Sequence, residues 1–186
     1  MNTPITGLVV DKHYAADMVE LRDELLSVYR EAYADKIQQA FFTEDRFWER
    51  VEAYARRDGF ELVTARVGGS LAGYALGYTL PAGSAWWHGL LNEVDPGLVV
   101  EDGSRTFALN YIMVRPSMRR RGIAEALHAA LMRGRPESRA TLLVLPDNIS
   151  AISGYRKWGW HQVGELKPFA DAPIYHSLLL NLTQPG

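Results

Sequence analysis

Four arginines close to the start of a predicted helix are the residues whose types and spacing point most directly to chemistry. They lie in the segment VRPSMRRRGIA, residues 114–124, and are Arg115, Arg119, Arg120 and Arg121. The positive end of a helix dipole disfavours each cation by a few tenths of a kcal/mol to about 1 kcal/mol, so an anion should offset them. Gly122 has no Cβ and leaves room for a bulky anion at the free N–H groups of the first turn, where phosphates bind.

Two elements must position this segment. Residues 107–114 form an apolar run that predicts a buried strand, and the residues after Gly122 predict a helix. The apolar positions of that helix recur at helical spacing: Ile123, Ala126, Leu127, Ala130 and Leu131. Gly134 and Pro136 predict its end. The arginines therefore belong to a strand-to-helix turn.

The beginning of the chain predicts a strand and two helices. We expect the strand at residues 5–10 and the first helix from about Tyr14. The predicted buried face of that helix carries Met18, Leu21, Leu25, Val28 and Ala32. Thr43 is the predicted N-cap of the second helix, and Gly59 suits its end. The face of the second helix that we expect to be buried carries Phe47, Val51 and Ala55.

A hairpin and an irregular segment come next. Residues 60–67 and 71–80 predict two strands, joined at Gly68-Gly69-Ser70 because glycine accepts the positive φ of a tight turn. Prolines and glycines interrupt residues 81–105, which also hold Trp86, Trp87 and His88.

The end of the chain completes the predicted fold. Residues 140–145 predict a strand, Asp147 or Asn148 a cap for a short helix that ends near Gly159, and residues 161–166 and 174–182 two last strands. The order predicts an α/β (α+β) fold. Its sheet is mixed and mostly antiparallel, has six to seven strands and is flanked by helices, in a single domain over residues 1–186.

The composition excludes several classes of function. A formal net charge of -2, from 20 Lys and Arg against 22 Asp and Glu, argues against a general nucleic-acid binder. The chain has no Cys, and its five His show no metal-ligand spacing, so we expect no disulfide, no cysteine nucleophile and no metal site. It has no apolar run long enough to span a bilayer and no signal peptide at its polar start. We expect a soluble cytoplasmic protein that does not bind membranes.

Two motifs resemble those of the GNAT superfamily, the acetyl-CoA-dependent N-acetyltransferases. The first is Val114-Arg115-Pro116 followed by residues 119–124, which match the family's Arg-x-x-Gly-x-Gly or Ala pattern. Ala124 stands where glycine is more usual, as in many members. The second motif comprises Asn148, Ala151, Tyr155 and Gly159-Trp160. The two motifs occur in the family's order with a predicted strand between them.

The resemblance implies where the cofactor binds. Acetyl-CoA would lie where the strands at residues 107–114 and 140–145 splay apart, with its arm beside Ile112, Met113 and Val114. Its pyrophosphate would sit on the turn and the helix start formed by Arg119, Arg120, Arg121, Gly122, Ile123 and Ala124. This placement agrees with the anion that the arginines call for.

The resemblance also implies catalytic roles. The backbone N–H of Ile112 would stabilise the oxyanion at the thioester carbonyl, and Tyr155 would give its proton to the leaving thiolate. A tyrosine pKa near 10 keeps that proton in place at neutral pH. Tyr155 would otherwise be a core tyrosine. Asn148 would be either a cofactor contact or simply an N-cap.

The general base is where this chain departs from the family. Many members have a glutamate four residues before the oxyanion amide, and here that residue is Ala108. The nearest acidic residues are ordinary surface carboxylates by expectation, and a water chain is the alternative to them. They are Glu93, Asp95, Glu101 and Asp102.

The acceptor is the least specified part of the prediction. The leading hypothesis is a small-molecule primary amine, and the alternatives are a protein or peptide amine and a non-catalytic acyl-CoA-binding module. Tyr29 and Tyr33 would wall an aromatic acceptor pocket or would simply pack in the core. Trp86 and Trp87 would serve as pocket wall, core or dimer contact, so a homodimer stays an option.

Overall fold

The computed structural model describes residues 5–182 and divides into two compact units. The first unit holds residues 5–78 and 111–133, and the second holds residues 79–110 and 134–182. Strand β4 (Thr106–Val114) contributes its first residues to the second unit and its last four to the first. The single domain expected over residues 1–186 stays a prediction.

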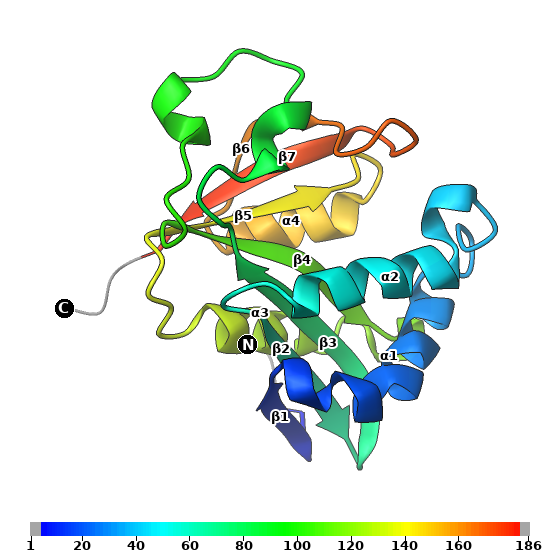
Figure 1. The fold of residues 1–186 in the computed structure, drawn as a ribbon. Helices are drawn as coiled ribbons and strands as arrows, with labels where there is room; N and C mark the ends of the chain where they lie inside the picture. The colour runs from blue at the N-terminus through cyan, green and yellow to red at the C-terminus, as the bar shows by residue number, and fades with distance from the viewer. Residues whose placement is uncertain (1–4, 183–186) are drawn as a thin grey trace. The chain divides into compact units, whose positions relative to one another are not determined.

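Seven strands form one mixed sheet within residues 5–182, in the order β1-β2-β3-β4-β5-β7-β6 (Figure 1). Besides β4 they are β1 (Leu8–His13), β2 (Glu61–Val67), β3 (Ser70–Thr79), β5 (Arg139–Val144), β6 (His161–Leu166) and β7 (Tyr175–Asn181). β4 and β5 pair in parallel from Thr106 opposite Arg139 to Leu109 opposite Leu142. The pairs β1/β2, β2/β3, β5/β7 and β6/β7 are antiparallel. The predicted mixed, mostly antiparallel sheet is confirmed.

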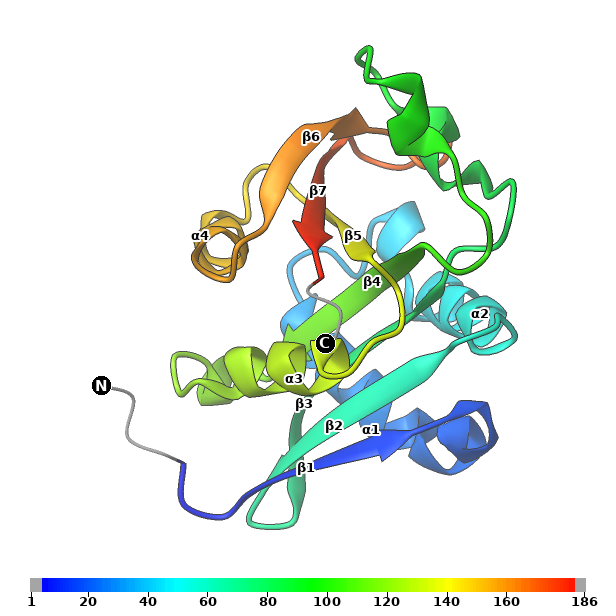
Figure 2. The same cartoon turned by 90° about the vertical axis from the view of Figure 1, so that its left-hand side faces the viewer.

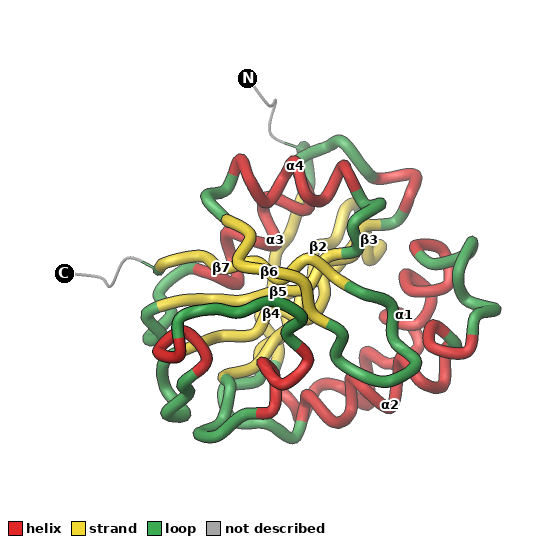
Figure 3. Tube along the Cα trace, turned by 90° about the horizontal axis from the view of Figure 1, so that it is seen from above, coloured by secondary structure: helices red, strands yellow, loops and turns green. Residues whose placement is uncertain are grey.

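Helices cover both faces of the sheet in the first unit. α1 (Met18–Ala32) and α2 (Glu44–Ala55) lie against one face, and α3 (Ile123–Met132) lies against β1 and β2 on the other (Figures 2 and 3). The fourth helix, α4 (Ile149–Lys157), belongs to the second unit. None of the helices in the described part of the chain is long and apolar enough to cross a bilayer.

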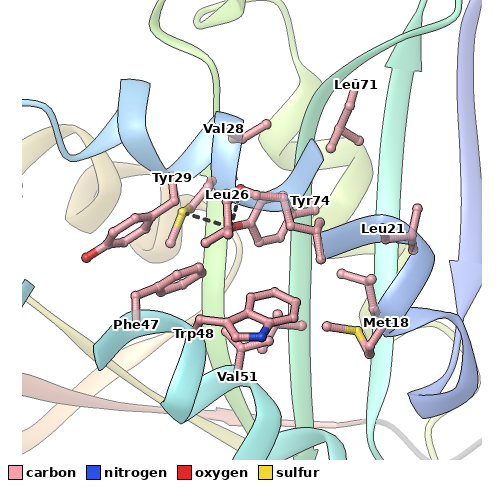
Figure 4. Packing of buried hydrophobic residues seen from close by; sticks show 14 of the residues in the cluster. Met18, Leu21, Leu26, Val28, Tyr29, Phe47, Trp48, Val51, Leu71 and Tyr74 are labelled. Atoms are coloured by element: carbon pink, nitrogen blue, oxygen red, sulfur yellow. Dashed lines mark hydrogen bonds between the residues drawn. The ribbon is translucent and has the colours of Figure 1, made fainter. Parts of the chain in front are cut away.

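The core of the first unit fills the space between α1, α2 and the strands. Figure 4 shows Met18 and Leu21 of α1 and Phe47 and Val51 of α2 gathered around Tyr74 of β3. The fully buried Tyr74 donates hydrogen bonds to the Leu25 carbonyl (3.3 Å) and the Met113 sulfur (3.4 Å). Burial raises the pKa of Tyr74 well above 10, so its hydroxyl stays a donor. These bonds tie β3 to α1 and to the end of β4.

The apolar periodicity of both early helices is confirmed, with shifts at their ends. Met18, Leu21, Leu25 and Val28 are buried, and a short 3-10 turn at Ala15–Asp17 precedes α1. Thr43 occupies the N-cap of α2 as predicted, but its side chain makes no capping hydrogen bond.

Strand β1 is the least accurate prediction. It was expected at residues 5–10 and runs over Leu8–His13. Gly7 has a φ of +76°, and the Leu8 N–H donates to the Ile5 carbonyl, so a turn occupies the predicted beginning of the strand. The polar end of the strand, including Asp11, is retained because every residue from Leu8 to His13 pairs with β2. Pairing overrides the weak apolar pattern there.

The β2–β3 hairpin forms as predicted. Gly68 and Gly69 have φ values of +58° and +82°, the conformation that a two-residue hairpin turn needs. Strands β2 and β3 begin and end within one residue of the predicted ranges.

A buried ion pair organises the irregular segment of the second unit. One oxygen of Glu101 accepts hydrogen bonds from Arg139 (2.8 Å), Trp87 (2.8 Å) and Thr106 (2.9 Å). The Arg139 guanidinium also donates to Thr106 (2.8 Å) and to the Leu98 carbonyl (2.6 Å). Trp87 is buried beside Leu166 and Leu179, with Trp86 packed against the same cluster, so the core role is confirmed for these tryptophans. The segment is therefore fastened to β4 and β5 without regular secondary structure.

We predict that Glu101→Ala destabilises the protein by about 3–5 kcal/mol, because it leaves the Arg139 charge buried without its partner. Chemical denaturation followed by circular dichroism measures the change. Glu93→Ala is the matched control, since Glu93 is exposed, and it should stay within about 0.5 kcal/mol of the parent. Equal effects of the two substitutions would contradict a structural role for Glu101.

Candidate functional site

The turn between β4 and α3 has the backbone of an anion-binding loop. Gly122 is the N-cap of α3, with a φ of +79°, and carries no side chain that could cap the first-turn N–H groups. Within residues 5–182, Arg120 is the one residue other than glycine with a positive φ, at +59°. Left-handed backbone at such a residue costs about 1–2 kcal/mol and often occurs at ligand-binding sites. Loops of this kind direct successive N–H groups toward one point, where an anion can bind.

Three of the four arginines in this segment stay at the turn, and the fourth, Arg115, does not. Arg119, Arg120 and Arg121 are exposed. Arg119 donates to the Val114 carbonyl (3.4 Å), while Arg121 contacts the sulfur of Met118 (3.1 Å). Both guanidinium groups therefore stay beside the turn.

Arg115 does not belong to the predicted cluster. Its guanidinium donates to the Leu71 carbonyl (2.7 Å) and the Ser27 hydroxyl (3.1 Å) and pairs with Glu31. The strand-to-helix turn carries its side chain toward α1, where a carboxylate already offsets the charge. Arg115 therefore does not contribute to the positive charge that we expected at the start of α3.

Strand β4 directs the backbone of Ile112 and Val114 away from β3. The Met113 carbonyl lies against Gly73 of β3, and the Arg115 N–H donates to the Ala72 carbonyl (2.8 Å). Backbone polar groups alternate in direction along a strand. The N–H groups of Ile112 and Val114 therefore face the edge of β4 opposite β3.

Gly73 is a functional candidate that the sequence interpretation missed. A Cβ at this position would lie well inside contact distance of the Met113 carbonyl oxygen and 3.1 Å from the Val114 Cα. Only glycine permits this close approach of β3 to Met113 and Val114 of β4. The available signal was a glycine within a strand pattern, which marks a bulge or a close backbone approach.

Helix α4 of the second unit has a capping motif at each end. The Asn148 side chain accepts a hydrogen bond from the Ala151 N–H (3.2 Å), so the N-cap interpretation of Asn148 is observed. At the other end, the Trp160 N–H donates to the Tyr155 carbonyl (3.0 Å) and the Gly159 N–H to the Arg156 carbonyl (3.1 Å). With Gly159 at a φ of +92°, this is a Schellman motif. The spacing from Asn148 to Trp160 is thus that of a helix capped at both ends.

The Tyr155 side chain lies against two tryptophans, and its hydroxyl keeps its proton. Its ring meets Trp158 and Trp160 edge to face, with centroids 5.8 and 5.9 Å apart. Among residues 5–182 no group makes a hydrogen bond with the hydroxyl. The ring is half-buried, and desolvation raises the pKa of Tyr155 far above its ordinary value. The hydroxyl is protonated at any physiological pH and has a proton to give.

The comparison with protein-family models decides the family. The model described as "Acetyltransferase (GNAT) family" matches residues 18–160, which is most of the chain. The chain belongs to the GNAT family of acetyltransferases. The resemblance inferred from the two motifs is confirmed.

Solved structures share the GNAT fold at low sequence identity. The ribosomal-protein-S18-alanine N-acetyltransferase from Escherichia coli is 17% identical, with a TM-score of 0.60 over 96% of each chain. The PaiA N-acetyltransferase from Thermoplasma acidophilum, solved with coenzyme A, is 12% identical, with a TM-score of 0.57 over 94% of this chain and 98% of its own. An aminoglycoside 6'-acetyltransferase type Ii is 16% identical, with a TM-score of 0.64 over 96% and 99%. No curated protein matches this chain.

None of the four carboxylates considered for the GNAT general base has the features of one. Glu101 is buried and bonded to three donors, which corrects the expectation of a surface carboxylate. Asp95 caps a 3-10 turn through the Gly97 N–H (2.7 Å). The Ser104 N–H and hydroxyl lower the pKa of Asp102, which makes it a weaker base. Glu93 is exposed.

Ala108, at the usual glutamate position, is fully buried, and its strand position pairs with Thr141 of β5. Within residues 5–182 no group of three or more His, Asp or Glu side chains could hold a metal ion. The described chain therefore offers no side-chain base at this point of β4.

We predict that Gly73→Ala destabilises this GNAT protein by about 1–3 kcal/mol and weakens coenzyme A binding, because the added methyl pushes β3 away from Met113. Thermal unfolding and calorimetric titration with coenzyme A are the measurements. Gly154→Ala is the matched control: its nearest neighbours would lie 3.8 Å from the new Cβ, and alanine favours the helix by about 0.5–1 kcal/mol. If Gly73→Ala unfolds and binds as the parent does, β3 does not restrain the site.

Proposed function

We propose that the protein transfers an acetyl group from acetyl-CoA to the primary amine of a small molecule by direct attack in a ternary complex. The GNAT family generally uses acetyl-CoA, and this supports the choice of donor. When bound, acetyl-CoA supplies an activated acetyl group as a thioester. The chain's own residues then need to hold the donor, activate its carbonyl, accept the amine and provide one proton.

The observation that carries the proposal is the left-handed backbone at Arg120 and Gly122 directly before α3. The N–H groups of Ile123 and Ala124, in the first turn of α3, have no intrahelical acceptor. Together with the exposed charges of Arg119, Arg120 and Arg121 they would hold the pyrophosphate. A strained loop, a helix N-terminus and a cation cluster are hard to explain together without an anion.

The edge of β4 would hold the arm of the donor and activate it. The N–H groups of Ile112 and Val114 face that edge because Met113 and Arg115 are engaged by β3. The Ile112 N–H would donate a hydrogen bond to the carbonyl oxygen under attack, and Met113 and Val114 would line the arm. A backbone donor held in place in this way needs no rearrangement during the reaction, which is the main source of such stabilisation.

Tyr155 would supply the proton for the leaving sulfur. Its hydroxyl keeps that proton because desolvation raises its pKa, and it makes no hydrogen bond with residues 5–182 that would have to break first. Asn148 would contribute by fixing the start of α4 and hence the orientation of the helix that carries Tyr155. We also propose that the Asn148 side chain contacts the cofactor directly.

The attacking amine would lose its proton to water. An alkyl amine with a pKa near 10 is neutral in only about one part in a thousand at pH 7. With no carboxylate at Ala108, the rate should depend on that neutral fraction. The amine nitrogen then forms the new C–N bond and the C–S bond breaks. Tyr155 protonates the sulfur, and the proton that the nitrogen loses returns through water to the Tyr155 oxygen.

The fold does not choose the acceptor. The names of similar structures include an enzyme for a ribosomal-protein alanine and one for aminoglycosides. A small molecule is supported by the aromatic cluster of the first unit around Tyr111, where Phe47 and Tyr54 contact its ring. Tyr54 and Tyr111 are only partly buried, so their rings could contact an apolar part of a small ligand.

The deciding experiment follows thiol release from acetyl-CoA with polyamines, aminoglycosides, amino acids with side-chain amines, and short peptides. Release that one small amine accelerates far above hydrolysis supports the proposal. Preference for peptides would move the acceptor to the protein class. Tight coenzyme A binding without accelerated release would leave a binding module in place of an enzyme.

We predict that Tyr155→Phe lowers kcat about 10–100-fold with little change in coenzyme A affinity, since it removes the proton and keeps the ring. In the parent, kcat/KM should rise about tenfold per pH unit toward the pKa of the amine. It should show no fall from Tyr155 below pH 10, because the pKa of Tyr155 is raised and the acid form persists. Stopped assays across pH 6–10 measure both. An unchanged kcat in the variant would remove Tyr155 as the acid.

A further inference from the structure

Arg50 of α2 is a half-buried arginine without an acidic partner. Its Nε donates to the Tyr111 hydroxyl (3.2 Å), and one Nη donates to the Phe41 carbonyl (3.1 Å). Its guanidinium lies 4.5 Å from the centroid of the Phe41 ring. A guanidinium carries five N–H donors, so five minus these two leaves three without an acceptor in residues 5–182.

Two other half-buried arginines of the first unit are paired with carboxylates. Arg66 binds both oxygens of Glu24 at 2.7 Å, and Arg115 pairs with Glu31. In the described part of the chain Arg50 has no such carboxylate. Partial desolvation of a charge is unfavourable unless an opposite charge offsets it. The folded unit therefore presents a cation whose counter-charge has to come from elsewhere.

Several aromatic rings lie near Arg50 and Tyr111. The Tyr111 ring contacts Phe47 (centroids 5.1 Å apart) and Tyr54 (6.4 Å), and Tyr54 stacks on Tyr78 (5.3 Å). Phe41 covers one face of the guanidinium. A planar fork among rings fits a carboxylate, which it can bind through two parallel hydrogen bonds.

The position of Tyr111 links this site to the chemistry. Tyr111 directly precedes Ile112 in β4, and its side chain packs on the same face as Met113, toward α1 and α2. The guanidinium meets the far end of the Tyr111 side chain. A ligand that bridges Arg50 and the backbone of Ile112 must therefore span about the length of a tyrosine side chain.

Resting on the function proposed above, we propose that Arg50 binds a carboxylate of the acceptor, so that the substrate is an amine with a carboxylate several bonds away. An α-amino group is separated from its own carboxylate by one carbon and cannot span this length. The substrate class is therefore ω-amino acids and related compounds. Tyr111 orients the guanidinium through its hydroxyl and is a positioning residue.

The experiment compares 6-aminohexanoate with hexylamine, which has the same chain without the carboxylate, and with glycine. In the parent protein, kcat/KM should be highest for 6-aminohexanoate. Arg50→Gln should reduce kcat/KM for 6-aminohexanoate by about 30-fold or more and leave hexylamine almost unchanged. Arg50→Lys keeps the charge but not the planar fork, so its kcat/KM for 6-aminohexanoate should lie between those of the parent and of Arg50→Gln.

Arg46→Gln is the matched control. Arg46 lies one turn earlier on α2 and also faces the Phe41 ring, at 5.4 Å, so the substitution removes the same charge nearby. It should leave the ratio of 6-aminohexanoate to hexylamine unchanged. Thermal unfolding of each variant shows that the fold persists. If Arg50 has a purely structural role, Arg50→Gln should lower kcat/KM equally for 6-aminohexanoate and hexylamine. That result would overturn the proposal.

A second measurement separates this inference from the proposed activity. Calorimetric titration of the protein alone with hexanoate should show binding that Arg50→Gln abolishes and Arg46→Gln keeps. If no amine is acetylated while hexanoate binding depends on Arg50, the activity fails and the carboxylate site stands. If acetylation proceeds but its kcat/KM depends neither on the carboxylate nor on Arg50, the activity stands and this inference fails. Stronger binding of inorganic phosphate than of hexanoate would also overturn it.

Discussion

The backbone of β4 is held against β3 at two points, where the Met113 carbonyl meets Gly73 and the Arg115 N–H donates to Ala72. Each point fixes a direction as well as a contact. Because backbone groups alternate along a strand, engaging residues 113 and 115 on one edge sends those of Ile112 and Val114 to the other. This register of β4 on β3 determines which edge of β4 is open for the proposed donor. It also determines where the Val114 carbonyl that binds Arg119 lies and in which direction the chain enters the turn.

Features set by backbone geometry were predictable from the sequence, because they need particular residues at fixed spacing. Gly122 before α3, the glycines of the hairpin and the capped helix from Asn148 to Trp160 are each a local requirement of the chain. The motif from Asn148 to Gly159 is a good example: a cap three residues before the N–H that donates to it, and a left-handed residue at the helix end, explain most of its spacing. Such signals survive without knowledge of the tertiary structure.

Features set by long-range pairing were not predictable. Arg115 and Arg119 look equivalent in the sequence, yet one pairs with Glu31 of α1 and the other stays beside the turn. Glu101 was expected at the surface and is buried, because Arg139, thirty-eight residues later in the chain, donates a hydrogen bond to its carboxylate. β1 extends over polar residues since β2 supplies their partners. In each case the deciding partner is distant in sequence, and the local sequence pattern does not identify it.

The same division separates donor from acceptor recognition. The donor would be held by the backbone N–H groups of Ile112, Val114 and residues 120–124. Most side-chain substitutions would leave these groups in place, so the sequence signal for donor binding is limited to the glycine and the turn. The acceptor would meet side chains of α2 and β4, among them Arg50 and Tyr111. These can change without disturbing the backbone. The fold is shared with structures named as an aminoglycoside 6'-acetyltransferase and a ribosomal-protein-alanine N-acetyltransferase, so the fold alone does not identify the acceptor. Acceptor identity therefore has to be inferred from unsatisfied chemistry in the individual structure, and an unpaired half-buried guanidinium is the clearest such feature within residues 5–182.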